Sequence, residues 1–252
     1  MLPGGFFTPG DTGAHELEPG QTQLRYGRNY LLYVTEPGEI SVTIGCIKIG
    51  RSENEAKVIV LDESGVEIAS AAAPVGEQAQ TTFSARRVGP YELRVDAGRN
   101  AFTLGAQGAG VLLPASAGGQ PFHGIRRAAP IYLFVPPGAR EFTVELTGQG
   151  TGETAKGHLL RPDGTEFAVL NTTGKMSDSL TVEVPEGTAD AVWAMTIEKG
   201  DDGIFEDFEV ALSGDVSPYV AEKPEDVLCP VMSASSGRVS RESRDPIIPV
   251  DI

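Results

Sequence analysis

The segment TAKGHLLRPDGTEFA, residues 154–168, has the layout of a β-hairpin, with two apolar runs separated by a Pro-Asp-Gly turn. Proline presets φ for the first central position of a turn, and glycine adopts a left-handed conformation at low cost. An earlier segment, EAKVIVLDESGVEIA, residues 55–69, repeats this layout without the proline. Identical residues pair at a constant offset of 99 positions, namely Ala56, Lys57, Gly65, Glu67 and Ala69 with Ala155, Lys156, Gly164, Glu166 and Ala168.

The correspondence extends along both flanks of the hairpin. YLLYV (30–34) matches IYLFV (131–135), a Pro-Gly pair follows each, and EISVTI (39–44) then matches EFTVEL (141–146). YELRV (91–95) matches WAMTI (193–197), and the offset drifts by only two or three residues. A repeated order of elements indicates a duplicated unit. We therefore predict two homologous domains, residues 1–107 and 108–221, followed by an extended or disordered tail, residues 222–252.

Each repeat has the pattern of short strands. In EFTVEL the apolar residues Phe142, Val144 and Leu146 alternate with polar ones, which is typical of a strand with one buried face. The 31 glycines and 18 prolines indicate many turns, and no long amphipathic helix is evident. The fold class that follows is all-β, with two tandem β-sandwich domains of jelly-roll or immunoglobulin-like type.

Charge and cysteine content exclude several classes of protein. The formal net charge of −15 repels phosphate backbones, so nucleic-acid binding is disfavoured. No run of 18 apolar residues is present, and we expect no membrane span. The two cysteines, Cys46 and Cys229, have no zinc-site spacing; a buried free thiol is expected for Cys46, with a bridge to Cys229 as the alternative.

The chain has no recognisable catalytic motif. The three histidines, His15, His123 and His158, lie in no metal-binding or nucleophile-activating pattern. The glycine-rich runs GAQGAG and GQGTGE do not lead from a strand into a helix, as a phosphate loop requires. We predict that the protein is not an enzyme, has no catalytic residues and needs no cofactor.

Paired carboxylates in KGDDGIFEDFE raise the alternative of a calcium site. Asp201 and Asp202 are the candidate ligands, because Ca²⁺ is bound by several oxygens of one flexible loop. The segment lacks the D-x-D-x-D-G pattern, so a solvated acidic loop is favoured over a metal site.

Aromatic and apolar residues on the first shared strand are candidate ligand contacts. Leu31 and Tyr33, and their counterparts Tyr132 and Phe134, lie opposite the face that Leu32 and Leu133 occupy. A strand that is apolar on both faces is either covered on both sides, which is the favoured interpretation, or presents an exposed contact strip. Trp193 alternates with Met195 and Ile197, which predicts a core position for its ring.

The segments FVPPG (134–138), RPDG (161–164) and the closing strand FEVAL (208–212) carry a resemblance to a known group of domains. The second half, and more loosely the first, resembles the accessory β-sandwich modules of bacterial secreted proteins, namely prepeptidase C-terminal-like and carbohydrate-binding-module-like domains. The resemblance implies an extracellular, non-catalytic role in contact with carbohydrate or protein. It assigns no ligand-binding residue, and fold alone does not fix function.

The sequence therefore leads to one expected function and two alternatives. We expect a non-catalytic binding or accessory protein with a polysaccharide as favoured ligand, or another protein as partner, in an extracellular or cell-surface location. The first ten residues, MLPGGFFTPG, lack the regions of a secretory signal, so a cytoplasmic location stays open. The alternatives are a structural protein that assembles into a homo-oligomer or fibre, and an enzyme with an unrecognised site.

Overall fold

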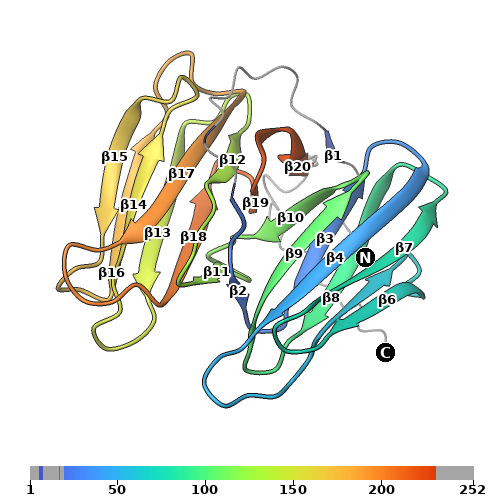
Figure 1. The fold of residues 1–252 in the computed structure, drawn as a ribbon. Coiled ribbons are helices and arrows are strands. Elements are labelled where there is room, and N and C mark those ends of the chain that lie inside the picture. The colour runs from blue at the N-terminus through green and yellow to red at the C-terminus, as the bar shows by residue number, and fades with distance from the viewer. Residues whose placement is uncertain (1–5, 8–16, 18–19, 231–252) are drawn as a thin grey trace, which may run out of the picture.

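The fold is all-β and is seen in a computed structural model that describes residues 6–7, 17 and 20–230. Figure 1 shows two groups of strands side by side, β2–β10 and β11–β19, which we call the first half and the second half. Both halves contribute to two large antiparallel sheets, which pack face to face in a sandwich-like arrangement. Among the described residues, no helix is long and apolar enough to cross a membrane.

The larger sheet has ten strands. In spatial order they are β15 (Glu166–Asn171), β14 (Ala155–Leu160), β17 (Ala191–Lys199), β12 (Ile131–Val135), β19 (Tyr219–Ala221), β10 (Gly110–Pro114), β3 (Asn29–Val34), β8 (Gly89–Asp96), β5 (Ala56–Leu61) and β6 (Glu67–Ala73). The halves meet where β10 pairs with β19, with Leu113 opposite Val220.

The smaller sheet has eight strands. In spatial order they are β16 (Ser177–Glu183), β13 (Glu141–Gly148), β18 (Asp207–Gly214), β11 (Phe122–Ile125), β2 (Leu24–Arg25), β9 (Ala101–Gln107), β4 (Gly38–Ile47) and β7 (Gln78–Ala85). Here the halves meet where β2 pairs with β11, with Leu24 opposite Gly124. A small additional sheet pairs β1 (Phe6–Phe7) with β20 (Cys229–Pro230), and a 3₁₀ turn, η1 (Pro224–Asp226), precedes β20.

The strand order is the same in the two halves. Adding nine to each strand number of the first half gives the second half, in reverse spatial order, in both sheets. Each sheet therefore reads symmetrically about the seam, which we define as the pairs β10–β19 and β2–β11. Both sheets continue across the seam, so the domain boundary at residue 107 stays a prediction. The common descent of the two halves is a prediction as well.

The core lies between the two sheets and is built by the alternation seen in the sequence. Phe142, Val144 and Leu146 of β13 are fully buried, while Glu141 at the start of the strand is exposed. Trp193 of β17 is also fully buried, as its alternation predicts, and its indole Nε1 donates to the carbonyl of Thr188 at 2.9 Å. One cluster of buried residues extends through both halves, from Leu24 to Val220.

The two matching hairpins have the turn geometry that their residues predict. Gly65 and Gly164 have φ values of +75° and +81°, which favour glycine. In both turns an aspartate accepts backbone N–H groups, from Ser64 and Val66 at Asp62 and from Thr165 at Asp163. These hairpins place β6 and β15 at opposite ends of the ten-stranded sheet.

Candidate functional site

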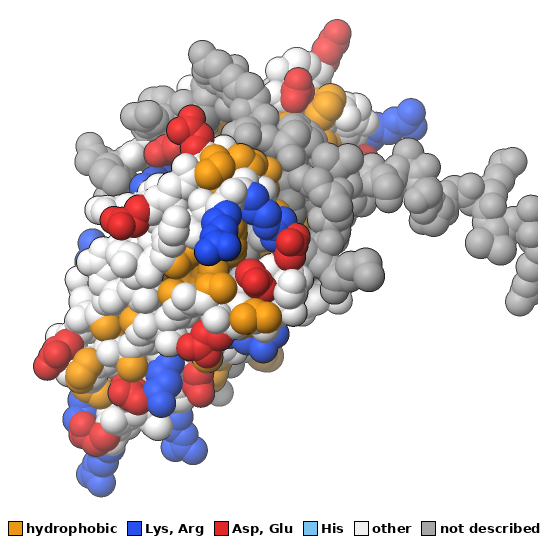
Figure 2. All heavy atoms as spheres, turned by 90° about the vertical axis from the view of Figure 1, so that its right-hand side faces the viewer, with side chains coloured by type: hydrophobic (Ala, Val, Ile, Leu, Met, Phe, Trp, Pro, Cys, Tyr) orange, Lys and Arg blue, Asp and Glu red, His pale blue; other side chains and the backbone are white. Residues whose placement is uncertain are grey.

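The strongest candidate site is a hollow of about 600 Å³ at the end of the first half, which we call the rim hollow. It lies between the β5–β6 turn and the chain that joins β7 to β8, and its lining residues are Asp62, Glu63, Ile68, Phe83, Ser84, Arg86, Arg87 and Tyr91. Figure 2 views the molecule from the side of β6 and β7, where basic, acidic and hydrophobic side chains lie next to one another. The hollow has the size and mixed lining of a small-ligand site.

Aromatic rings form the floor of the rim hollow. Phe83 and Tyr91 are both buried, and their ring centroids lie 5.3 Å apart. Ile68 of β6, which is 38% exposed, forms one wall. An apolar floor under a polar rim can hold a flat ligand and orient it by hydrogen bonds.

The second half has a larger side chain at the position of Ile68, which forms one wall of the rim hollow in the first half. By the alignment of the hairpins Ile68 corresponds to Phe167, and Tyr91 corresponds to Trp193. Phe167 packs edge-on against Trp193, with centroids 5.3 Å apart and 72° between the planes. The Phe167 ring thus covers Trp193 in the second half. The smaller Ile68 at the same position in the first half leaves the hollow open beside Tyr91.

Arg87 gives the rim hollow its polar character. Its guanidinium carbon lies 5.8 Å from the centroid of the Tyr91 ring, and Nη1 pairs with Glu63 Oε2 at 2.6 Å. Its Nη2 is buried and has no hydrogen-bond partner among the described residues. Arg86 beside it is exposed and forms no ion pair with any described residue.

The residues predicted as ligand contacts lie elsewhere, on the outer face of the ten-stranded sheet. Leu31, Tyr132 and Phe134 are buried there and Tyr33 is partly buried. The chain itself covers them, because the cluster that they form also contains Leu17, Val227 and Leu228. Val227 and Leu228 of the predicted tail are therefore packed against the sheet, and residues 231–252 lie outside the described part of the chain. A ligand-contact role for these four residues stays a prediction.

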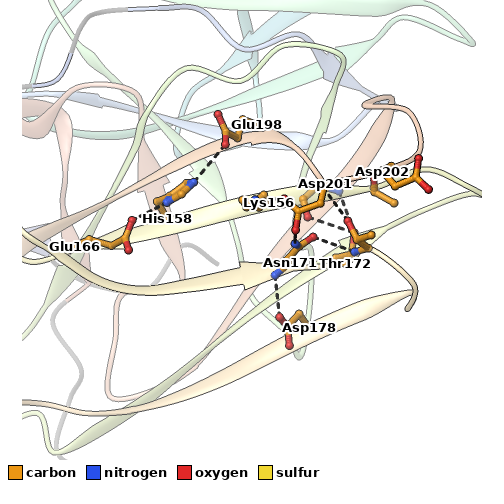
Figure 3. A network of polar contacts seen from close by, with 12 residues as sticks. Lys156, His158, Glu166, Asn171, Thr172, Asp178, Glu198, Asp201 and Asp202 are labelled. Carbon is orange, nitrogen blue, oxygen red and sulfur yellow. Dashed lines mark hydrogen bonds and ion pairs between the residues drawn. The ribbon is translucent and has the colours of Figure 1, made fainter.

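The predicted calcium ligands belong to a network of polar contacts (Figure 3). Asp201 forms an ion pair with Lys156 and accepts a hydrogen bond from Asn171 Nδ2, and its pKa is lowered by the Lys156 contact. Asp202 accepts from the N–H of Gly203 at 2.7 Å and is turned away from the Asp201 contacts. The described residues contain no group of three or more histidine, cysteine or carboxylate side chains that could hold a metal ion.

The histidines divide between a buried and a more exposed setting. His158 lies between Glu166 and Glu198, at 2.7 Å and 3.4 Å, on the outer face of β14 (Figure 3). His123 is buried between Glu209, 2.8 Å from Nδ1, and Asp207, 3.1 Å from Nε2. His15 lies outside the described residues.

Two arginines of the first half complete the cluster around His123 at the seam. Arg25 of β2 pairs with Asp207, and Arg28 Nη2 lies 3.4 Å from Glu209 Oε1. The hydrogen bond from His123 holds the pKa of Glu209 below its usual range. Because every carboxylate here has a basic partner, the cluster links β2 to β18 in the manner of a structural network.

A second, smaller hollow of about 300 Å³ opens at the seam. Its lining residues are Gly20, Gln21, Leu24, Leu104, Gly105, Ala106, Ala109, Val111, Leu113, Glu222, Lys223 and Asp226. Burial raises the pKa of Asp226 to about 6 and also raises the pKa of Glu222, whose carboxylate accepts the Thr22 N–H at 2.8 Å. This hollow has no aromatic lining residue, so it offers a ring no flat surface to stack on.

Cys46 is the remaining reactive group of the core. It is buried and present as a free thiol, as the sequence predicts, and it is not bridged to Cys229. Burial raises the pKa of this thiol, which makes it a poor nucleophile at neutral pH.

Comparison with known proteins assigns no relative to this chain. No protein-family model matches it, and no curated protein shows significant sequence similarity to it. No sequence motif marks Ile68, Phe83, Arg86 or Arg87 as site residues, and none of them was predicted as one. The usable signal was the size difference between Ile68 and Phe167 at matching positions of an otherwise conserved hairpin layout.

Proposed function

We propose that this chain is a non-catalytic binding protein, with a glycan as its favoured ligand and the rim hollow as the binding site. The observation that carries the proposal is the exchange of Phe167 for Ile68 between two otherwise similar hairpins. The first half has space beside Tyr91 where the second half places an aromatic ring. A pyranose ring is a puckered chair with C–H groups on its faces and hydroxyl groups around its edge, so it suits a space with an apolar floor and a polar rim.

Three features of the hollow support a glycan as ligand. Its floor is aromatic, its volume is about 600 Å³, and its rim offers both donors and acceptors. A sugar face can lie against Ile68 and the edges of Phe83 and Tyr91, while Ser84 and Glu63 are placed to hydrogen-bond hydroxyl groups. The extracellular location expected for such a role is part of this proposal.

The test is to fill the rim hollow with the residue that the second half uses. Ile68→Phe should keep the fold and reduce affinity for a bound oligosaccharide by about tenfold or more, a loss of about 1.4 kcal/mol. The matched control is Val169→Phe, which adds a ring at an exposed position of β15, away from the hollow. Calorimetric titration, guided by a glycan array, measures the effect, and equal affinity for both variants and the parent chain would exclude the hollow as the site.

A second candidate function, assembly of copies into a homo-oligomer or fibre, is favoured by the edges of the sheets. Among the described strands, β6 and β15 each have a single neighbour in the ten-stranded sheet, and β7 and β16 each have one in the smaller sheet. Open edges are templates for pairing with another chain. Light scattering across a concentration series tests this, with Ala72→Lys on the exposed face of β6 as the variant that should reduce the mass if edges pair.

A further inference from the structure

We infer that the hollow at the seam, which we call the seam hollow, binds a small alkylamine and that Asp226 is the counter-ion of its ammonium group. This site is independent of the proposed function, because it shares no lining residue with the rim hollow. Three segments that are distant in the sequence line it, namely residues 20–24, 104–113 and 222–226. Its volume of about 300 Å³ lies at the lower end of the range for small-molecule sites, roughly 300–1,000 Å³.

The carboxylate of Asp226 lines the seam hollow without a hydrogen-bond partner or an ion pair among the described residues. It lies close to the backbone of β10, since a Cβ on Gly110 would be 2.9 Å from Asp226 Oδ1. Asp226 is half-buried, and neither of its oxygens is among the fully enclosed atoms that lack a partner. A ligand in the hollow can therefore reach a carboxylate that no protein group contacts.

The other ionisable lining residues are Glu222 and Lys223. Glu222 accepts the Thr22 N–H at 2.8 Å, which fixes its position. Lys223 is exposed and forms no ion pair with Asp226 in the described part of the chain, although its charge lowers the pKa of that carboxyl group. The lining thus has two carboxyl groups and one ammonium group, which favours a cation over an anion.

The rest of the lining determines what kind of cation fits. The walls are apolar and small, with Leu24, Leu104, Val111 and Leu113 beside alanines and glycines, and Gln21 is the neutral polar side chain among them. Methylene groups gain free energy against such walls, whereas the hydroxyl groups of a sugar would lose their hydrogen bonds. A hard inorganic cation needs several oxygen ligands, and the described residues contain no such group. An ammonium group on a short alkyl chain satisfies both the carboxylate and the walls.

The ionisation of Asp226 gives the site a characteristic pH dependence. Burial raises its pKa to about 6, so the carboxylate is charged at neutral pH, where an alkylamine with a pKa of about 10.4 is charged as well. Binding should weaken as the pH falls below about 6, because protonated Asp226 has no charge to offer. Glu222, Lys223 and Glu225 are the other ionisable groups that line the hollow or act on Asp226, and Glu222 titrates in the acidic range too. Asp226→Asn separates the two carboxyl groups, since it should remove the pH dependence that belongs to Asp226.

The experiment titrates the full chain with three probes at about pH 7.5 and follows binding by NMR chemical shifts. The probes are 1-aminobutane, the neutral 1-butanol, and Nα-acetyl-lysine methylamide, which carries the same ammonium group on a peptide unit. We expect the amine to bind about tenfold more tightly than the alcohol, which is the size of one charge-assisted hydrogen-bonded contact. The lysine derivative should bind no more tightly than the amine, because its amide groups find few partners at the apolar walls.

Four variants assign the contact. Asp226→Asn should lower amine binding to the level of the alcohol and leave alcohol binding unchanged. Glu225→Gln is the matched control on the same turn, where the side chain is exposed and does not line the hollow, and it should keep the preference for the amine. Lys223→Gln removes a competing positive charge and should strengthen amine binding about twofold. Ala109→Leu fills the hollow and should weaken the binding of amine and alcohol alike.

Thermal unfolding of each variant near that of the parent chain is the expected accompanying result. Equal binding of amine and alcohol, or a preference for the amine that survives Asp226→Asn, overturns the role of Asp226. Amine binding that is undiminished in Ala109→Leu overturns the seam hollow as the site. Tighter binding of the lysine derivative overturns the assignment to a free amine and indicates a lysine side chain of a partner protein. Since none of these variants alters the rim hollow, the glycan proposal is tested separately by Ile68→Phe.

Discussion

The ring of Phe167 lies edge-on to that of Trp193, with 5.3 Å between the centroids, and covers the Trp193 ring at the end of the second half. Removing this ring should open a second hollow like the one beside Tyr91. Phe167→Ala is expected to destabilise the fold by about 2 kcal/mol, because the ring is only partly buried and the site can relax. Urea denaturation measures the loss. Val169→Ala, at an exposed position of the same strand, should cost less than about 0.5 kcal/mol.

A pair of glycine substitutions tests how tightly the core of the second half is packed. A Cβ on Gly124 would lie 2.2 Å from Cζ of Phe208, a rigid ring that is fully buried. A Cβ on Gly157 would lie 2.1 Å from Cε of Met195, the flexible end of its side chain. Gly124→Ala should therefore cost about 3 kcal/mol and Gly157→Ala about 1 kcal/mol. Denaturation of both variants decides the order, and a larger loss for Gly157→Ala would contradict it.

Local patterns in the sequence predicted the fold class and the turns. The alternation in EFTVEL placed Phe142 and Val144 in the core, because a strand at a sandwich surface has only two faces to assign. The glycines of the two hairpins took left-handed conformations, because their turns require them.

The joining of the halves could not be predicted in the same way. The pairs Leu113–Val220 and Leu24–Gly124 join residues about 100 apart in sequence, and β2 is only two residues long, too short to show any period. The rim hollow could not be predicted from the sequence either, because it depends on the size difference between Ile68 and Phe167 and not on a motif.

The hollow at the seam makes stability depend on pH through Asp226. Burial raises its folded-state pKa to about 6, above the ordinary value of 3.8, so the folded chain holds a proton that the unfolded chain releases between these values. Stability should fall as the pH rises from about 4 to 6 and stay lower above that range. Asp226→Asn removes this loss and should be more stable than the parent chain at about pH 7.5 by about 2 kcal/mol, with little difference near pH 4.

The control for the pH effect lies on the same 3₁₀ turn. Glu225 is exposed and does not line the hollow, so Glu225→Gln should change the free energy of unfolding by less than about 0.5 kcal/mol at either pH. Guanidinium denaturation curves of the three proteins at both pH values make the comparison. Equal pH dependence of Asp226→Asn and the parent chain would show that Asp226 is ordinary in the folded state.

The charged cluster around His123 should hold the seam together through Asp207. Asp207→Asn leaves Arg25, whose side chain is 18% exposed, without its carboxylate, and it weakens the contact to His123 Nε2. Breaking a largely buried pair by removing one partner costs about 3 kcal/mol, because the remaining charge stays desolvated.

The control is an exposed ion pair. Glu53→Gln removes the pair of Glu53 with Lys48 and should cost less than about 1 kcal/mol. Urea denaturation at low and high salt measures both, and the loss for Asp207→Asn should depend less on salt, since the pair is shielded from solvent ions. Equal losses for the two variants would mean that the cluster does not stabilise the contact between β2 and β18.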